Sequence, residues 1–353
     1  MPKEKRIYWV DNAKAIGILL VLIRHTPLPE KILSFIYSFH IPLFFFLSGI
    51  FFKSSNFPDF FRKKYKRLLI PYFVIGLLSI LMWIPKKYIL ELDQDIEFWF
   101  PFFGLLYGNV NFIIFNKPIW FLVCLFVVNI SFFFIFKIFE NSKNKYFLIF
   151  GFLLLLAFFG YLYSLYKPLR LPWMMDTALV AVLFFGLGLI YKHKLSKKVF
   201  TFTNQQKFTL IFILFVIVVI ISILNGRIDM AEIIFNNCFL FLVGSFSGIL
   251  MIILISELIP KNRIFGYIGK NTMIIFTFHT PVYSIIIFIS IYLFKYPITT
   301  IYTKLPLINP EANPIFISMV FVLPTLIILI PIIELINRKF PFLIGLEKNK
   351  DCK

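Results

Sequence analysis

The first apolar segment of this chain carries four ionisable residues, Asp11, Lys14, Arg24 and His25. Successive residues of an α-helix rotate by about 100° and rise by about 1.5 Å, so Lys14 and His25 share one face about 16 Å apart. Asp11 lies close to the same face, whereas Arg24 is predicted to point elsewhere. A cation and an imidazole so placed suit a long anionic substrate with a reactive tip. The cation would hold phosphate, and the imidazole would accept a proton or an acyl group.

The alternative interpretation is structural, with Asp11 and Lys14 as an interfacial ion pair and His25 bonded to a neighbouring helix. Two further histidines favour a functional role, because His40 and His279 also lie inside apolar segments. Ionisable residues at membrane depth are costly and commonly mark functional sites. We therefore expect His40, and with less support His279, to take part in catalysis or in acceptor binding. His193 lies between two lysines and is interpreted as solvated.

Other residues offer chemistry with a structural alternative beside it. Ser48 and Gly49 allow a backbone or a ligand to approach closely, or serve ordinary helix packing. Trp120 is an interface anchor or a platform for a sugar ring, and Asp176 is a further acid whose alternative is a polar contact between helices. A basic cluster orients its helix and is also a candidate phosphate site; it comprises Arg62, Lys63, Lys64, Lys66 and Arg67.

The composition identifies the environment of these residues. Of the 353 residues, 60% are hydrophobic and only 15% are charged, against about 45–50% and about 25% in soluble domains. This excludes soluble classes and predicts a membrane protein. The net charge of +19 would suggest nucleic acid in a soluble protein, but here most basic residues lie in alternate loops, so we expect no nucleic acid partner. Cys124, Cys238 and Cys352 form neither a metal spacing nor a disulfide framework, so no metal is expected.

Helix-length apolar runs predict an all-α polytopic bundle of about ten transmembrane helices. The expected spans are 12–30, 33–52, 68–85, 119–138, 146–166, 173–191, 208–225, 233–258, 272–294 and 315–337. The distribution of Lys and Arg places both termini in the cytoplasm. Residues 99–115, which are aromatic but interrupted by Pro, Gly and Asn, are expected to be interfacial or re-entrant. We expect one membrane domain over residues 1–353, with no appended soluble domain; association with further copies of the chain is left open.

In order and spacing, the motifs resemble the membrane acyltransferase-3 family, and most closely its fucose 4-O-acetylase-like branch. The resemblance is carried by WVDNAKAIGI (9–18), His25, FHIPLFFFLSG (39–49), RLLIPY (67–72), WFL (120–122) and GYIGKNT (266–272) leading to His279. It implies a bacterial cytoplasmic-membrane enzyme that transfers acetyl from cytosolic acetyl-CoA to a hydroxyl of a surface polysaccharide or its lipid-linked precursor. Many relatives have Arg where this chain has Lys14, and Lys cannot bind phosphate bidentately.

The resemblance also implies roles for individual residues. His25 would be the general base or a transient acetyl carrier, and Asp11 would orient Lys14. Ser48 and Gly49 would line the passage of the thioester. The phosphates of coenzyme A would be held by Lys14, Arg62, Lys63 and Arg67, and the acceptor would be positioned by His40, Trp120 and His279.

Two non-enzymatic functions remain as alternatives. A secondary transporter would use the intramembrane His and Asp residues as a proton relay, although we detect no inverted repeat. A flippase-like exporter of glycan intermediates would grip diphosphate with Lys14 and the basic loops, and it would need no acyl donor.

Overall fold

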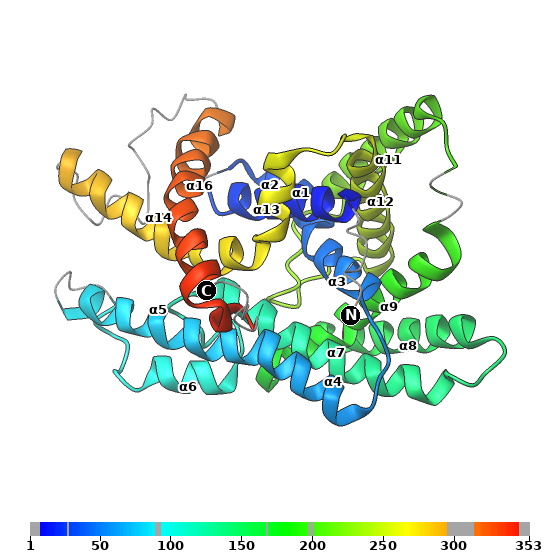
Figure 1. Cartoon of the computed structure of the whole chain (residues 1–353), viewed down its shortest axis with the longest axis horizontal. Coiled ribbons are helices and arrows are strands. Elements are labelled where there is room, and N and C mark those ends of the chain that lie inside the picture. Colours follow the sequence, from blue (N-terminus) through cyan, green and yellow to red (C-terminus); the bar gives the residue numbers. More distant parts are fainter. Residues whose placement is uncertain are drawn as a thin grey trace.

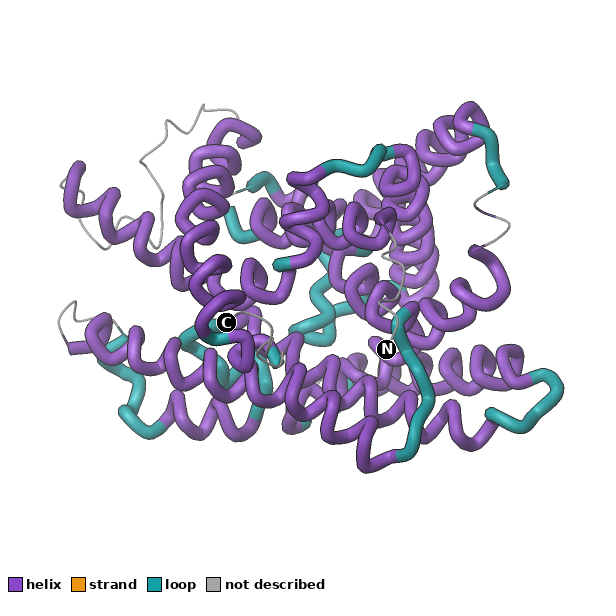
Figure 2. Tube along the Cα trace, in the orientation of Figure 1, coloured by secondary structure: helices purple, strands orange, loops and turns teal. Residues whose placement is uncertain are grey.

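The computed structural model describes residues 8–26, 28–88, 93–166, 169–196, 199, 201–294 and 314–345. These parts of the chain are helical, joined by loops, and include no β-strand (Figure 2); residues 229 and 234 form one isolated β-bridge. Eight helical stretches of the described chain are long and apolar enough to cross a membrane, and Thr272–Ile286 is a shorter apolar helix. The all-α membrane fold is therefore confirmed. The cytoplasmic placement of both termini stays a prediction.

Each predicted span coincides with a helix, except that 33–52 is divided between two helices, and several boundaries move. The helices are α1 (Tyr8–Arg24), α2 (Glu30–Tyr37), α3 (His40–Ile50), α4 (Phe57–Lys64), α5 (Ile70–Tyr88), α6 (Phe100–Tyr107), α7 (Trp120–Phe139), α8 (Lys145–Leu165), α9 (Met175–Ile190), α11 (Asn204–Asn225), α12 (Cys238–Leu258), α13 (Arg263–Lys270), α14 (Thr272–Phe294) and α16 (Pro314–Lys339). Shorter turns of helix are η1 (Tyr65–Leu69), η2 (Lys117–Ile119), η3 (Pro172–Met174), η4 (Tyr191–Leu195) and η5 (Pro341–Ile344). Helix α6, at about 12 Å, is too short to cross a bilayer.

Helix α1 lies at the centre of the packing. It contacts α2, α3, α12, α13, α14 and α16, and Figure 1 shows it in the upper half of the view beside α2 and α13. Its small residues Ala13, Ala15 and Gly17 are buried, so neighbouring helices approach closely. The Asn12 amide donates to the carbonyl oxygens of Ser256 and Ile259, each at 3.1 Å. That side chain thereby satisfies backbone acceptors at the C-terminal end of α12, which the helix itself leaves unpaired.

The second predicted span is broken into α2 and α3 by a turn at Ser38 and Phe39. Pro42 explains the break, because a proline ring clashes with the carbonyl of the residue four positions earlier, which is Ser38. The Ser245 hydroxyl donates to that carbonyl at 2.7 Å. A freed backbone acceptor inside the membrane is thus satisfied by α12.

Helices α3 and α9 pack with their backbones in close approach. A Cβ atom added to Gly49 would collide with the backbone carbonyl of Phe185, and one added to Gly188 would collide with that of Phe46. Gly49 of α3 therefore packs against the backbone of α9, and Gly188 of α9 packs against the backbone of α3. The packing alternative for the Ser48-Gly49 pair accounts for Gly49.

We expect Gly49→Ala to destabilise the protein, because a methyl group forced against a backbone carbonyl costs roughly 1–3 kcal/mol. The midpoint of thermal unfolding in detergent should fall by several degrees. Gly151→Ala on α8 is the matched control, since a Cβ there meets no atom within 4 Å and alanine favours a helix over glycine. Equal midpoints for the two variants would show that α3 and α9 can separate without cost.

Candidate active site

His25 lies just beyond the end of α1, in a turn held by the last helices of the chain. The Thr26 hydroxyl donates to the Ile23 carbonyl at 2.6 Å and lies 2.7 Å from the Ser318 hydroxyl of α16. The Tyr283 hydroxyl of α14 donates to the Leu22 carbonyl at 2.9 Å. The prediction that this helix continues to residue 30 is therefore wrong. The prolines at positions 27 and 29, which lack an N–H, and the side-chain bond of Thr26 end the helix early.

The structure brings His25 together with His279, as the candidate site requires. Their ring centroids are 4.9 Å apart. Nδ1 of the buried His279 is 2.7 Å from the Phe276 carbonyl, so Nδ1 carries the proton, because a carbonyl only accepts. Nε2 then accepts from the Thr280 hydroxyl at 3.3 Å. Both ring nitrogens of His279 are therefore occupied, and its imidazole is fixed against His25.

His40 opens α3 close to the same end of α1, and it is fully buried. Its Nδ1 donates to the Ile36 carbonyl at 2.8 Å, and its Nε2 has no hydrogen-bond partner among the residues that the structure describes. The ring of Tyr37 lies 5.2 Å from the His40 ring, between centroids. The guanidinium of Arg24 sits 4.7 Å from the centroid of Tyr37, so this tyrosine links His40 to the turn that carries His25.

Two cavities meet at His25. One of about 240 Å³ is lined by Val21, Arg24, His25, Tyr37, Ile41, Val110, Lys117, Pro118, Trp120, Arg227, Asp229, Ala231, Glu232 and Phe276. The other, of about 330 Å³, is lined by His25, Ser79, Met82, Trp83, Asp93, Ile114, Phe115, Lys117, Pro118, Thr280, Pro281 and Ser284. The predicted acceptor residue Trp120 lines the first cavity. A single imidazole is thus accessible from two spaces of small-molecule size.

The placement of Arg24 corrects the helical-wheel prediction. Its Nη1 atom lies 3.4 Å from Nε2 of His25, and it lines the same cavity. The wheel fails because His25 lies past the helix end, where the chain turns. Since a guanidinium only donates, Nε2 of His25 holds a lone pair in this arrangement, which is the form that a general base needs.

Charged residues from the loop after α11 complete the first cavity, although their sequence context indicated no role for them. Arg227 donates to the Tyr37 hydroxyl at 3.1 Å and lies 3.9 Å from Asp229. Burial raises the pKa of Glu232 above its ordinary value, and Asp229 adds to this, while Arg170 and Lys117 oppose it. Tertiary packing alone brings these side chains to the cavity, and no spacing in the sequence reveals it.

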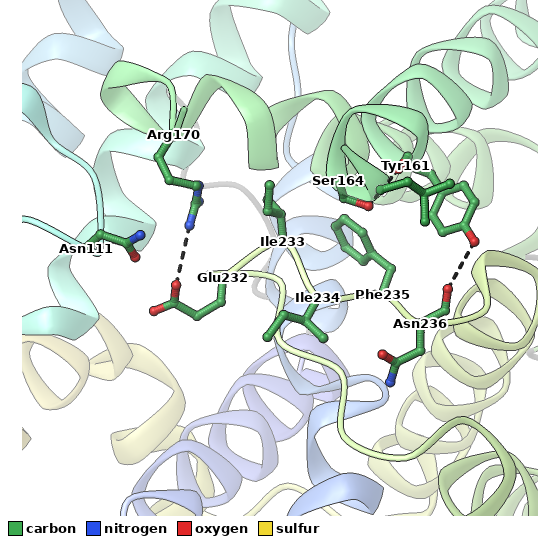
Figure 3. A pocket seen from close by; sticks show the side chains of 10 residues that line it. Asn111, Tyr161, Ser164, Arg170, Glu232, Ile233, Ile234, Phe235 and Asn236 are labelled. Carbon is green, nitrogen blue, oxygen red and sulfur yellow. Dashed lines mark hydrogen bonds and ion pairs between the residues drawn. The ribbon is translucent and has the colours of Figure 1, made fainter. Parts of the chain in front are cut away.

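A third cavity, of about 450 Å³, adjoins the first through their common residue Glu232. Figure 3 shows Arg170 and Glu232 pointing toward each other across it, with 3.5 Å between Nη1 and Oε2. Arg170 also binds the buried carboxylate of Asp176 at 2.7 Å, and the same carboxylate accepts from the Thr177 backbone N–H at 2.7 Å. Asp176 is thus satisfied structurally, but by residues close to it in the chain and not by the neighbouring helix that the structural alternative predicts.

The residues predicted to handle coenzyme A do not line either cavity at His25. Lys14 lies in the first half of α1, with its ammonium 5.0 Å from the ring centroid of Phe51, the residue after α3. Asp11 lies one turn before it, where Gly269 of α13 packs against its backbone. The Ser48 hydroxyl donates to the Phe44 carbonyl at 2.8 Å. Arg62 and Lys63 on α4 and Arg67 in η1 are exposed.

The candidate residues therefore divide into two groups. His25, His279, His40 and Trp120 gather at the C-terminal end of α1; of the predicted phosphate-binding residues, Lys14 lies in the first half of α1, and Arg62, Lys63 and Arg67 lie on α4 and η1. No group of three or more His, Cys, Asp or Glu side chains within the described parts of the chain could hold a metal ion.

Comparison with known proteins identifies the family. Neither the curated proteins nor the solved structures gave a match. Among family models, the acyltransferase domain of the acyltransferase-3 family matches residues 7–334, which include both groups of candidate residues. A chain matched over most of its length, with eight helical stretches able to cross a membrane, is a membrane acyltransferase, and it belongs to the acyltransferase-3 family.

Proposed function

We propose that this acyltransferase transfers acetyl from cytosolic acetyl-CoA to a hydroxyl of a surface polysaccharide or its lipid-linked precursor, in a bacterial cytoplasmic membrane. The observation that carries the proposal is the position of His25, where two cavities meet beside a second, fixed imidazole. The motifs further suggest the fucose 4-O-acetylase-like branch of the family.

His25 acts in one of two ways, and both use the lone pair that faces Arg24. As a general base, it takes the proton of the acceptor hydroxyl while the oxygen attacks the thioester carbon; the carbon–sulfur bond breaks, and the thiolate leaves and regains the proton. As an acyl carrier, its nitrogen attacks the thioester carbon, the carbon–sulfur bond breaks and the thiolate leaves; the acceptor oxygen then attacks the acetyl-imidazole, the carbon–nitrogen bond breaks, and the proton of the hydroxyl passes to the thiolate. In both cases His279 holds the His25 ring in place by contact.

The donor reaches His25 from the end of α1 that carries Lys14. Lys14 with Arg62, Lys63 and Arg67 binds the phosphates of coenzyme A, Asp11 orients Lys14, and Ser48 lines the passage of the thioester. The rise of about 16 Å from Lys14 to His25 along an ideal helix matches an extended pantetheine arm. Gly49 contributes to this passage through the close packing of α3 and α9.

The acceptor is bound at the other end of α1. Trp120 supports this, because it lines the cavity that holds His25, and an indole offers a flat apolar face to a sugar ring. His40 lies behind Tyr37 at the edge of the same site, with one nitrogen available. His279 completes the acceptor side of His25.

We predict that His25→Ala abolishes acetyl transfer, because loss of a general base or nucleophile lowers the rate by roughly 10²–10⁴-fold. The measurement is alkali-releasable acetate on surface glycans of a deletion strain complemented with wild type or variant at matched membrane levels. His193→Ala is the control and should restore the acetate. Equal restoration by His25→Ala would give His25 a structural role, and absence of ester in every strain would favour the transporter or flippase.

We predict that Lys14→Ala raises the KM for acetyl-CoA by roughly tenfold or more, because one charge-assisted hydrogen bond contributes about 1.5–3 kcal/mol. Lys14→Arg should keep the wild-type KM or lower it, since a guanidinium binds phosphate bidentately. Initial rates of purified protein at varied acetyl-CoA concentration measure both. An unchanged KM for acetyl-CoA with a raised KM for the acceptor would contradict this prediction, because Lys14 would then bind the acceptor and not the donor.

A further inference from the structure

The cavity that combines His25 and Trp120 is lined by three basic side chains from three separate segments. Arg24 is the last residue of α1, Lys117 opens η2, and Arg227 lies in the loop after α11. These segments are far apart in the sequence, so the fold alone gathers the cations. Three positive charges beside one imidazole repel one another unless negative groups balance them.

The two acids of the cavity already have partners. Asp229 lies 3.9 Å from Arg227, and Glu232 lies 3.5 Å from Arg170. Arg227 is also 3.9 Å from Glu30. Within the described ranges, by contrast, neither Arg24 nor Lys117 has a carboxylate within 4 Å. Among the described residues, these two cations therefore form no close ion pair, although Lys117 is near enough to Glu232 to oppose the rise in the pKa of that carboxyl.

Arg24 is additionally held in a way that leaves donor capacity unused. Its Nε atom is buried and has no hydrogen-bond partner among the described residues. Its guanidinium lies 4.7 Å from the centroid of Tyr37, and the guanidinium of Arg227 lies 4.7 Å from the same centroid. Two like charges against one ring repel each other. An anion bound by Arg24 would reduce this repulsion and would accept a hydrogen bond from the unsatisfied Nε atom.

The anion is not part of the donor on this arrangement. The phosphates of coenzyme A are assigned to Lys14, and Arg24 lies ten residues further along α1, which is about 15 Å of helix. Trp120, the residue with the best face for a sugar, lines the cavity with Arg24. The cations Arg24 and Lys117 are therefore on the acceptor side.

We propose, on the basis of the acetyltransferase function above, that the acceptor carries an acidic group next to the hydroxyl that is acetylated, and that Arg24 and Lys117 bind it. The group is a carboxylate, as in an acidic sugar, or a phosphate, as in a phosphate-linked glycan. Planar Arg24 binds either one through paired N–H donors, and Lys117 adds a point charge.

The first arm measures binding without donor, using purified full-length protein in phosphatidylcholine nanodiscs. The probes are trigalacturonic acid against its carboxyl-reduced trisaccharide, and glucose 6-phosphate against glucose, by isothermal titration calorimetry. The acidic member of at least one pair should bind tenfold more tightly or better, and Lys117→Gln and Arg24→Gln should remove that difference. Lys117 is exposed, so its variant tests the proposal even where Arg24→Gln fails to fold. Lys31→Gln, an exposed charge removal on α2, should leave the difference intact.

The second arm repeats the pairs as acceptors with radiolabelled acetyl-CoA. A wild-type preference in kcat/KM for an acidic acceptor that disappears in Lys117→Gln, with the KM for acetyl-CoA unchanged, supports the proposal. Equal use of acidic and neutral members in both arms overturns it while leaving the acetyltransferase function in place. Acidic binding without transfer to any acceptor would instead overturn the acetyltransferase function. If phosphatidylglycerol nanodiscs abolish the charge preference, the cations bind a lipid headgroup, and the assignment to the acceptor is wrong.

Discussion

Inside a bilayer every polar group must find a partner within the protein, and α1 concentrates this constraint in one short helix. It carries Asp11, Lys14 and Arg24, with His25 directly after it, and it contacts six other helices. Its neighbours supply what lipid cannot. Tyr283 bonds the last turn, Ser318 bonds the Thr26 hydroxyl, and the α12 terminus receives Asn12. A large part of the bundle therefore consists of helices that surround α1.

The division of the candidate residues into two groups follows from this packing around α1. The Lys14 end lies beside Phe51 and the end of α3, while His279 and the cavity lined by Lys117 and Arg227 lie at the other end. Two cavities share His25 in their lining, so one imidazole can be reached from two different spaces. None of the residues predicted to bind coenzyme A lines either cavity.

The sequence predicted the helices well because lipid imposes a minimum length on apolar runs, and composition alone reveals that length. The interest in His25, His40 and His279 rests on the rarity of ionisable residues in apolar segments, and the structure brings the His25 and His279 ring centroids to 4.9 Å. A common function for these histidines and Trp120 stays a prediction. Sequence reasoning failed at Arg24, because a helical wheel assumes that the helix continues through His25. The prolines at 27 and 29 indicate an earlier end of the helix, and with that end the direction of Arg24 is no longer set by the helical wheel.

Other features were beyond sequence reasoning for a different reason. The cavity at His25 is lined by a loop whose path depends on tertiary packing, and this loop contributes Arg227, Asp229 and Glu232. The pairing of Arg170 with Asp176 and Glu232 fixes that path. No periodic pattern encodes such contacts. Pro42 by itself indicates a bend in this span, but the bond from Ser245 that satisfies the Ser38 carbonyl depends on tertiary packing.

The bonds to Tyr283 and Ser318 have a consequence for how the protein is made. The turn around His25 is among the first parts of the chain to emerge from the ribosome, yet the residues that hold it are synthesised more than 250 positions later. Until α14 and α16 are made, the Leu22 carbonyl and the Thr26 hydroxyl lack these two partners. The turn that carries His25 therefore reaches its final arrangement only after α14 and α16 are in place, although it precedes them in the chain.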